Sequence, residues 1–91
     1  MAFIAVFSPK SMTAAQYDEV IKRLQAAGAG APKGRLHHVC YGSGDQLQVT
    51  DIWESDETFE QFGQILMPIL QQVGVDPGPP TISPVHSIIP G

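Results

Sequence analysis

The sequence predicts a single α+β domain with the element order β-α-β-β-α-β, in which two helices cover one face of a four-stranded antiparallel sheet. Three observations lead to this prediction. Two segments repeat apolar residues at helical spacing, four short segments are rich in β-branched and aromatic residues, and turn-forming residues separate them. The chain has 91 residues, which is the size of one domain.

The first strand and helix are marked by their boundary residues. Residues 2–8 form an apolar run that a proline interrupts. Thr13 is followed three residues later by Gln16, and this pair is typical of a capping box at a helix start. Apolar residues at helical spacing then predict an amphipathic helix over residues 14–27. Glycines indicate a flexible loop over residues 28–34.

Two further strands form a predicted hairpin. They cover residues 35–41 and 46–53, and the sequence Gly-Ser-Gly-Asp between them favours a tight turn. This turn predicts a register with Cys40 opposite Leu47, and a slip of one residue would exchange the two faces. The predicted helix-facing side carries Leu36, His38, Cys40, Leu47, Val49, Asp51 and Trp53. The predicted opposite side carries Arg35, His37, Val39, Tyr41, Gln46, Gln48, Thr50 and Ile52.

The second helix and the last strand complete the order. Ser55 is a predicted N-cap, followed by two acidic residues that the helix dipole favours, and Gly74 ends the helix. Pro68 lies within its apolar stripe and predicts a kink. The last strand covers residues 81–89, and Pro84 within it indicates a sheet edge or a bulge. With right-handed crossovers, this order gives the ferredoxin-like arrangement.

Two of the predicted strands are apolar on both faces. Residues 3–7, and most of residues 85–89, lack the alternation of a strand with one wet face. The chain supplies helices for only one face of the sheet. We therefore expect a second copy of the chain to cover the other face, giving a homodimer in which two sheets form an α+β barrel.

The composition limits the range of partners and compartments. A net charge of −4, with five scattered basic residues, argues against nucleic acid as a partner. No segment approaches the roughly 18 apolar residues of a membrane span, so no membrane partner is expected. Cys40 is the single cysteine, which excludes an internal disulfide and indicates a cytoplasmic protein.

His38 and Asp51 are the polar residues on the predicted helix-facing side. Burying either one unpaired costs about 1 to 3 kcal/mol, so each requires a hydrogen-bond partner. One interpretation is a satisfied polar pair in the core. The other is a ligand pocket walled by Tyr17 and Trp53, in which His38 exchanges protons near neutral pH. His86 on the last strand is either structural or lines the same cavity.

No metal site is predicted. His37 and His38 are adjacent in a strand, so their side chains point to opposite faces and cannot share an ion. The sequence also lacks a neighbouring cluster of cysteine or glutamate ligands. No cofactor is expected.

The residues around the third strand resemble a known group of proteins. The run Val-Thr-Asp-Ile-Trp-Glu-Ser over residues 49–55, which leads into a helix with Phe59 and Phe62, and the final Pro-Val-His over residues 84–86 carry this resemblance. The chain resembles the dimeric α+β barrel superfamily, which includes antibiotic-biosynthesis monooxygenase-like proteins. The resemblance implies two ferredoxin-like subunits with their sheets face to face and a pocket between sheet and helices.

Members of that superfamily include cofactor-independent oxygenases of aromatic polyketides and haem-degrading monooxygenases. The haem-degrading members resemble one another in an Asn on the first strand, a Trp on the third strand and a His on the second helix. This sequence has Trp53 but neither of the other two residues, so haem turnover is not expected. In the other branch, an electron-rich substrate reacting with O₂ needs an apolar pocket and a proton acceptor, and His38 or His86 fits that role.

Three functions remain open at this point. The first is a cofactor-independent monooxygenase-like enzyme with His38 as the base and Asp51 as the group that orients it. The second is a non-catalytic dimer that binds or carries a small hydrophobic molecule. The third is a structural subunit of a larger assembly. Replacement of His38 by alanine separates the first two, because only an enzyme has turnover to lose.

Overall fold

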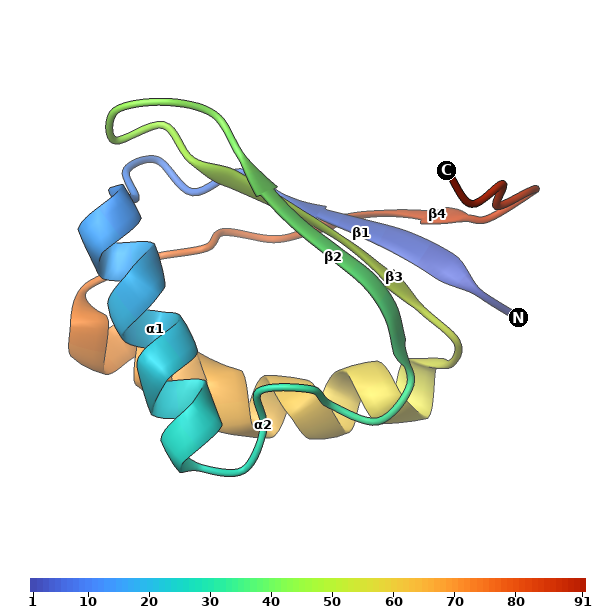
Figure 1. Ribbon diagram of the computed structural model, residues 1–91, viewed down its shortest axis with the longest axis horizontal. Helices are drawn as coiled ribbons and strands as arrows, with labels where there is room; N and C mark the ends of the chain where they lie inside the picture. Colours follow the sequence, from blue (N-terminus) through green and yellow to red (C-terminus); the bar gives the residue numbers. More distant parts are fainter.

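The computed structural model describes all 91 residues and has the predicted order of elements. The elements are β1 (Phe3–Phe7), α1 (Ala14–Ala26), β2 (Arg35–Tyr41), β3 (Gln48–Trp53), α2 (Asp56–Val73) and β4 (Thr81–Pro84). The strands form one antiparallel sheet in the order β2-β3-β1-β4. Both helices lie on the same side of this sheet (Figure 1). The predicted ferredoxin-like α+β fold is therefore confirmed.

The predicted helix caps are confirmed. The Gln16 backbone N–H donates to Thr13 Oγ1 at 3.1 Å, and the Thr13 N–H donates to Gln16 Oε1 at 2.9 Å, which completes the capping box. Ser55 caps α2 by accepting from the Thr58 N–H. Gly74 ends α2 with φ of 87°, a left-handed conformation that glycine adopts without steric cost. Neither helix combines the length and the apolar character that a bilayer span requires.

The hydrophobic core lies between the sheet and the helices and contains Trp53, which is completely buried. The indole ring packs against Phe59 and Phe62, with ring centroids 5.6 and 5.3 Å away. Burying each aromatic ring of this kind contributes about 1.5 to 3 kcal/mol. These rings therefore attach the first half of α2 to β3. The helix continues past Pro68 as a single element.

The pairing of β2 with β3 differs from the predicted register by two residues. His38 pairs directly with Asp51, whereas the predicted turn made them diagonal neighbours. The segment after the turn is bound to Met12. The Met12 N–H donates to the Asp45 carbonyl at 2.7 Å, and the Leu47 N–H donates to the Met12 carbonyl at 3.3 Å. A shift of two residues preserves the faces of a strand, so His38 and Asp51 remain on the helix-facing side as predicted.

A β-bulge at the start of β2 overturns the predicted faces of two residues. The register shifts between Arg35, which pairs with Trp53, and His37. An extra residue in one strand re-aims the side chains around it. Leu36 was expected under the helices but is 53% exposed. Arg35 was expected on the opposite side but lies on the helix-facing side.

β4 ends at Pro84 and does not extend to residue 89 as predicted. Proline has no N–H, so the ladder with β1 loses a donor at this position. The Val85 N–H still donates to the Ala2 carbonyl at 3.0 Å, and no later residue makes a backbone hydrogen bond to the sheet. The strand order confirms that β4 is an edge strand, as the proline indicated.

The sheet face away from the helices is open and carries apolar side chains beside polar ones. It carries Ile4, Val6, Val39, Tyr41 and Ile52. Val39 is 42% exposed and Tyr41 is 41% exposed. This is the surface that the sequence predicts a second subunit to cover.

Candidate functional site

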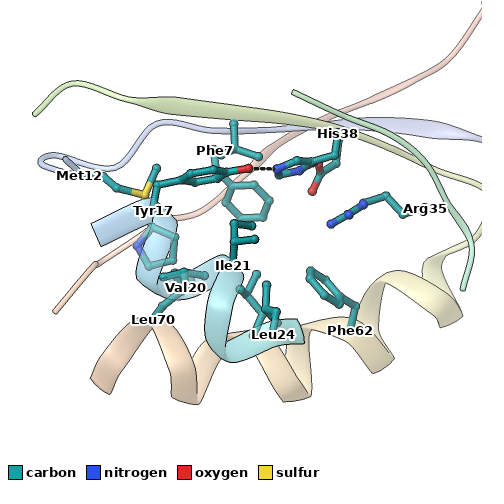
Figure 2. A pocket seen from close by; sticks show the side chains of 14 residues that line it. Phe7, Met12, Tyr17, Val20, Ile21, Leu24, Arg35, His38, Phe62 and Leu70 are labelled. Carbon is teal, nitrogen blue, oxygen red and sulfur yellow. Dashed lines mark hydrogen bonds and ion pairs between the residues drawn. The ribbon is translucent and has the colours of Figure 1, made fainter. Parts of the chain in front are cut away.

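A cavity of about 70 Å³ lies between the sheet and the two helices (Figure 2). Fourteen residues line it, and ten of these are hydrophobic. The polar groups at its wall are the Tyr17 hydroxyl, Arg35, His38 and Asp51. Small-molecule sites are usually apolar cavities with a few polar groups at the wall.

Two more open pockets adjoin this cavity. One, of about 230 Å³, shares Arg35 and His38 with it and lies beside the loop that precedes β2. The other, of about 240 Å³, shares Asp51 and Phe62 with it and lies under the loop between α2 and β4. The polar groups at the cavity wall thus also border these two pockets.

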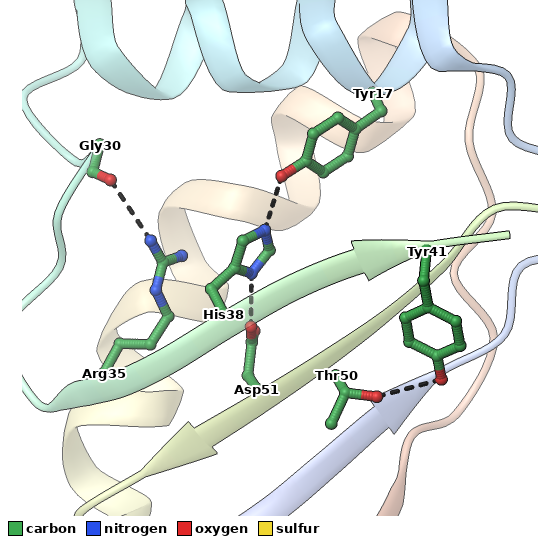
Figure 3. A network of polar contacts seen from close by, with 7 residues as sticks. All are labelled: Tyr17, Gly30, Arg35, His38, Tyr41, Thr50 and Asp51. Atoms are coloured by element: carbon green, nitrogen blue, oxygen red, sulfur yellow. Dashed lines mark hydrogen bonds and ion pairs between the residues drawn. The ribbon is translucent and has the colours of Figure 1, made fainter. Parts of the chain in front are cut away.

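Three of the polar side chains form a chain of hydrogen bonds (Figure 3). Tyr17 Oη lies 2.7 Å from His38 Nε2, and His38 Nδ1 lies 2.5 Å from Asp51 Oδ1. An ionised carboxylate can only accept, so the proton resides on Nδ1, which donates to Asp51. This tautomer leaves Nε2 of the neutral imidazole as the acceptor of the Tyr17 O–H.

Each group of this chain is held by a regular element. His38 and Asp51 face each other across β2 and β3, whereas Tyr17 reaches them from the first turn of α1. The rings of Tyr17 and His38 are nearly parallel, with an angle of 9° between their planes. The side chain of Asp51 is 7% exposed and that of His38 is 21% exposed. The carboxylate is thus shielded from water while the imidazole remains accessible.

The electrostatic surroundings keep Tyr17 protonated. Burial raises the pKa of the Tyr17 phenol above its ordinary value of 10.0, negative groups nearby add to this shift, and the positive charge of Arg35 opposes it. Tyr17 is therefore a neutral hydroxyl at neutral pH. Burial also raises the pKa of the Cys40 thiol above 9.0, so this residue lacks the thiolate character of a nucleophile.

Arg35 is a site residue that the sequence reasoning missed. The bulge turns it toward the cavity, where its guanidinium lies over the Phe62 ring at 5.7 Å from the centroid. Its Nη2 donates to the Gly30 carbonyl at 3.3 Å. The only local sign in the sequence is Gly34, which has a φ of +88° immediately before the strand. A glycine alone does not reveal a bulge.

The structure does not bring the other two predicted pocket residues to the cavity. Trp53 lies in the core and is absent from the cavity lining, and its indole N–H has no hydrogen-bond partner. His86 lies beyond the end of β4, is exposed, and is likewise absent from the lining. Of the predicted residues, the structure brings together Tyr17, His38 and Asp51.

No group of three or more His, Cys, Asp or Glu side chains is arranged to hold a metal ion. His37 is exposed, whereas His38 lines the cavity, as the alternation of a strand requires.

The fold is similar to those of several solved structures. Protein YJCS matches with a TM-score of 0.66 and 13% identity over 94% of this chain and 100% of that chain. A "putative antibiotic biosynthesis monooxygenase" from Caulobacter crescentus CB15 matches with a TM-score of 0.64 and 18% identity, covering 97% of this chain and 91% of that chain. SnoaB, a cofactor-independent oxygenase from Streptomyces nogalater, matches with a TM-score of 0.58 and 15% identity, covering 99% and 96%.

These likenesses confirm the predicted resemblance to antibiotic-biosynthesis monooxygenase-like proteins at the level of the fold. No protein-family model matches the sequence, and no curated protein matches it.

Proposed function

We propose that this protein is a monooxygenase-like enzyme that works without a cofactor and removes a proton from a small apolar or aromatic substrate. The observation that carries this proposal is the hydrogen-bonded chain from Tyr17 through His38 to Asp51 at the wall of an apolar cavity. The similarity in fold to SnoaB, which is a cofactor-independent oxygenase, supports it.

The first step is the loss of a proton from a C–H bond that a carbonyl group makes acidic. Tyr17 Oη accepts this proton while its own proton moves to His38 Nε2, so the imidazole becomes an imidazolium. Asp51 stabilises that charge through Nδ1 and keeps the ring in the required tautomer. The apolar surroundings strengthen this interaction because few water dipoles compete with it.

The carbanion then reduces O₂ directly. One electron passes to O₂, and the two radicals combine into a peroxide. The peroxide takes up a proton from the hydrogen-bonded chain of Tyr17, His38 and Asp51, which forms a proton relay. His38 next accepts the remaining C–H proton through Tyr17, the O–O bond breaks, and the departing hydroxide is protonated to water. The balance is R₂CH₂ + O₂ → R₂C=O + H₂O, in which the substrate is oxidised and O₂ is reduced.

The test measures oxygen uptake with 2-indanone and anthrone, which have two and three rings and an acidic methylene group. We expect His38→Ala to lower the rate of ketone formation on the order of 10²- to 10⁴-fold, as the loss of a general base does. Tyr17→Phe breaks the relay at its other end and is expected to lower the rate as well. His37→Ala is the matched control, because this exposed neighbour lies off the cavity. Equal rates in all three variants would contradict the proposal.

One observation favours the alternative, a dimer that binds a small molecule without turnover. Tyr17 already occupies His38 Nε2 in the folded chain, so the imidazole has no free lone pair for a substrate. A binder retains ligand affinity in His38→Ala and consumes no O₂ with either probe. Enzyme-dependent oxygen uptake that is lost in His38→Ala excludes this alternative.

We also propose that the protein is a homodimer through the open sheet face, since its apolar side chains have no cover within the chain. Val39→Asp places a charge on this face, on the edge strand β2. Ile65→Asp on α2 is the matched control, because both residues are 42% exposed. We expect sedimentation to give a dimer for the wild type and Ile65→Asp, and a dissociation constant raised at least on the order of tenfold for Val39→Asp. A wild-type monomer at micromolar concentration would contradict the dimer.

A further inference from the structure

Arg35 is the one residue at the cavity wall with a positive charge, and the proposed reaction does not use it. Arg23, by contrast, pairs with Glu19 at 2.8 Å. Although the chain has nine acidic residues, none of them forms an ion pair with Arg35. The single hydrogen bond of its side chain goes to the Gly30 carbonyl. Most of the five N–H donors of the guanidinium group therefore have no acceptor in the protein.

Two contacts and the bulge orient the guanidinium group toward the cavity. The bulge directs the side chain toward the helices, the Phe62 ring supports its planar face at 5.7 Å, and Gly30 fixes one nitrogen. Figure 2 shows it pointing into the cavity from the side of β2. A planar fork oriented in this way loses less conformational freedom when a ligand binds than a free side chain would.

Arg35 lines the same cavity as the relay residues Tyr17, His38 and Asp51. Arg35 and His38 both line the cavity and the adjoining pocket of about 230 Å³. The positive charge of Arg35 is close enough to lower the pKa of Tyr17 against the opposing effect of burial. A ligand that reaches the Tyr17 hydroxyl is therefore also within range of the guanidinium charge.

We propose that the site selects an aryl carboxylic acid, whose carboxylate binds Arg35 while an acidic hydroxyl or C–H group of the ring faces Tyr17 and His38. The guanidinium fork matches a planar carboxylate with two parallel hydrogen bonds. A single guanidinium group neutralises one negative charge, which suits a monoanion better than a phosphate dianion. This inference rests on the proposed function for the reacting groups and deepens it by naming the substrate class.

The experiment compares the binding of salicylate and salicylamide by calorimetric titration at neutral pH. The two molecules have nearly the same shape, and only salicylate carries a carboxylate. We expect the wild type to bind salicylate more tightly on the order of tenfold. Arg35→Met keeps an apolar stem over Phe62 and is expected to abolish this preference without weakening salicylamide. Arg35→Lys keeps the charge but loses the fork, and is expected to retain part of the preference.

Lys33→Met is the matched control, because it removes one positive charge from an exposed residue of the neighbouring loop. Equal affinities for the two ligands in the wild type, or no binding of either, would overturn the inference. So would a preference that survives in Arg35→Met or is lost equally in Lys33→Met. If salicylate is preferred but neither 2-indanone nor anthrone supports oxygen uptake, the proposed reaction is rejected and the inference about Arg35 stands. Turnover of 2-indanone without carboxylate preference rejects this inference alone.

Discussion

Replacing His38 alone leaves a buried carboxylate without its partner. Asp51 is 5% exposed, and its side chain has no hydrogen-bond partner other than His38. Removing the partner of a buried charge costs about 3 to 5 kcal/mol, because the charge is left uncompensated. The side chain of His38 is 21% exposed, so water enters when it is removed. We therefore expect the lower end for His38→Leu, a loss of about 3 kcal/mol in the free energy of unfolding.

Replacing both residues removes the buried charge together with its partner. Leucine has nearly the shape of aspartate, and the wall of this cavity is mostly apolar. Exchange of a buried pair for apolar residues is often neutral or stabilising. We therefore expect the free energy of unfolding of His38→Leu/Asp51→Leu to lie within about 1 kcal/mol of the wild-type value. Asp51→Leu alone leaves a neutral imidazole bonded to Tyr17 and costs about 1 kcal/mol. The coupling energy of this cycle is then at least about 3 kcal/mol.

Urea unfolding, followed by Trp53 fluorescence and circular dichroism, measures the free energy of unfolding of the wild type, the two single variants and the double variant. Domains of this kind have a stability of about 5 to 15 kcal/mol, so a loss of about 3 kcal/mol is resolved while the protein remains folded. A double variant whose loss equals the sum of the two single losses would refute the reasoning, because Asp51 would then not depend on its partner. A folded double variant also serves as a control for activity, since it lacks the relay without lacking the fold.

Two other predictions concern the site's surroundings. The pKa of Tyr17 is higher in the folded chain than its ordinary value of 10.0, so its contribution to stability is present below that pH and is lost as pH rises through the folded pKa. The Cys40 thiol also has a raised pKa, so the test is made in a Cys40→Ala background. There we expect Tyr17→Phe to reduce the fall in the free energy of unfolding at alkaline pH, measured by urea unfolding. An unchanged dependence on pH would contradict this. A Cβ at Gly34, where φ is +88°, would lie 2.3 Å from Thr58 Oγ1, so we expect Gly34→Ala to cost more than about 2 kcal/mol by the same measurement. Gly28→Ala has a similar φ of +76° and no atom within 4 Å, so it is expected to cost about 1 kcal/mol, and equal losses would contradict the role of the clash.

The fold was predictable because its signals are local. The capping box at Thr13, the N-cap at Ser55 and the glycine at the end of α2 each depend on a few neighbouring residues. The inward direction of His38 and Asp51 was also predictable, since a two-residue shift of register preserves the face of every side chain.

The errors arose where distant segments decide the geometry. The hairpin register is set by backbone bonds between Met12 and the segment after the turn, which the turn sequence does not encode. The bulge that turns Arg35 inward also depends on its pairing with Trp53. The bond from Tyr17 to His38 requires α1 to pack at one height above β2. Helical periodicity predicts that Tyr17 lies on the buried side of the helix, but it does not predict this contact.

The small volume of the cavity leads to a last prediction about substrate size. Ligand pockets usually enclose roughly 300 to 1,000 Å³, whereas this cavity encloses about 70 Å³. Leu66 lines both the cavity and the neighbouring pocket of about 240 Å³, so we expect Leu66→Ala to join them. The truncation costs about 2 to 3 kcal/mol of stability and raises the rate with three-ring anthrone relative to two-ring 2-indanone.

Met67→Ala is the matched control for this prediction, because Met67 lines the neighbouring pocket but not the cavity. The ratio of the two rates is expected to stay at its wild-type value in this variant. The comparison separates a gain of space at the relay from a general loosening of α2, which would change both variants alike. A rate ratio that rises equally in Leu66→Ala and Met67→Ala would therefore mean that the cavity wall does not limit the size of the substrate.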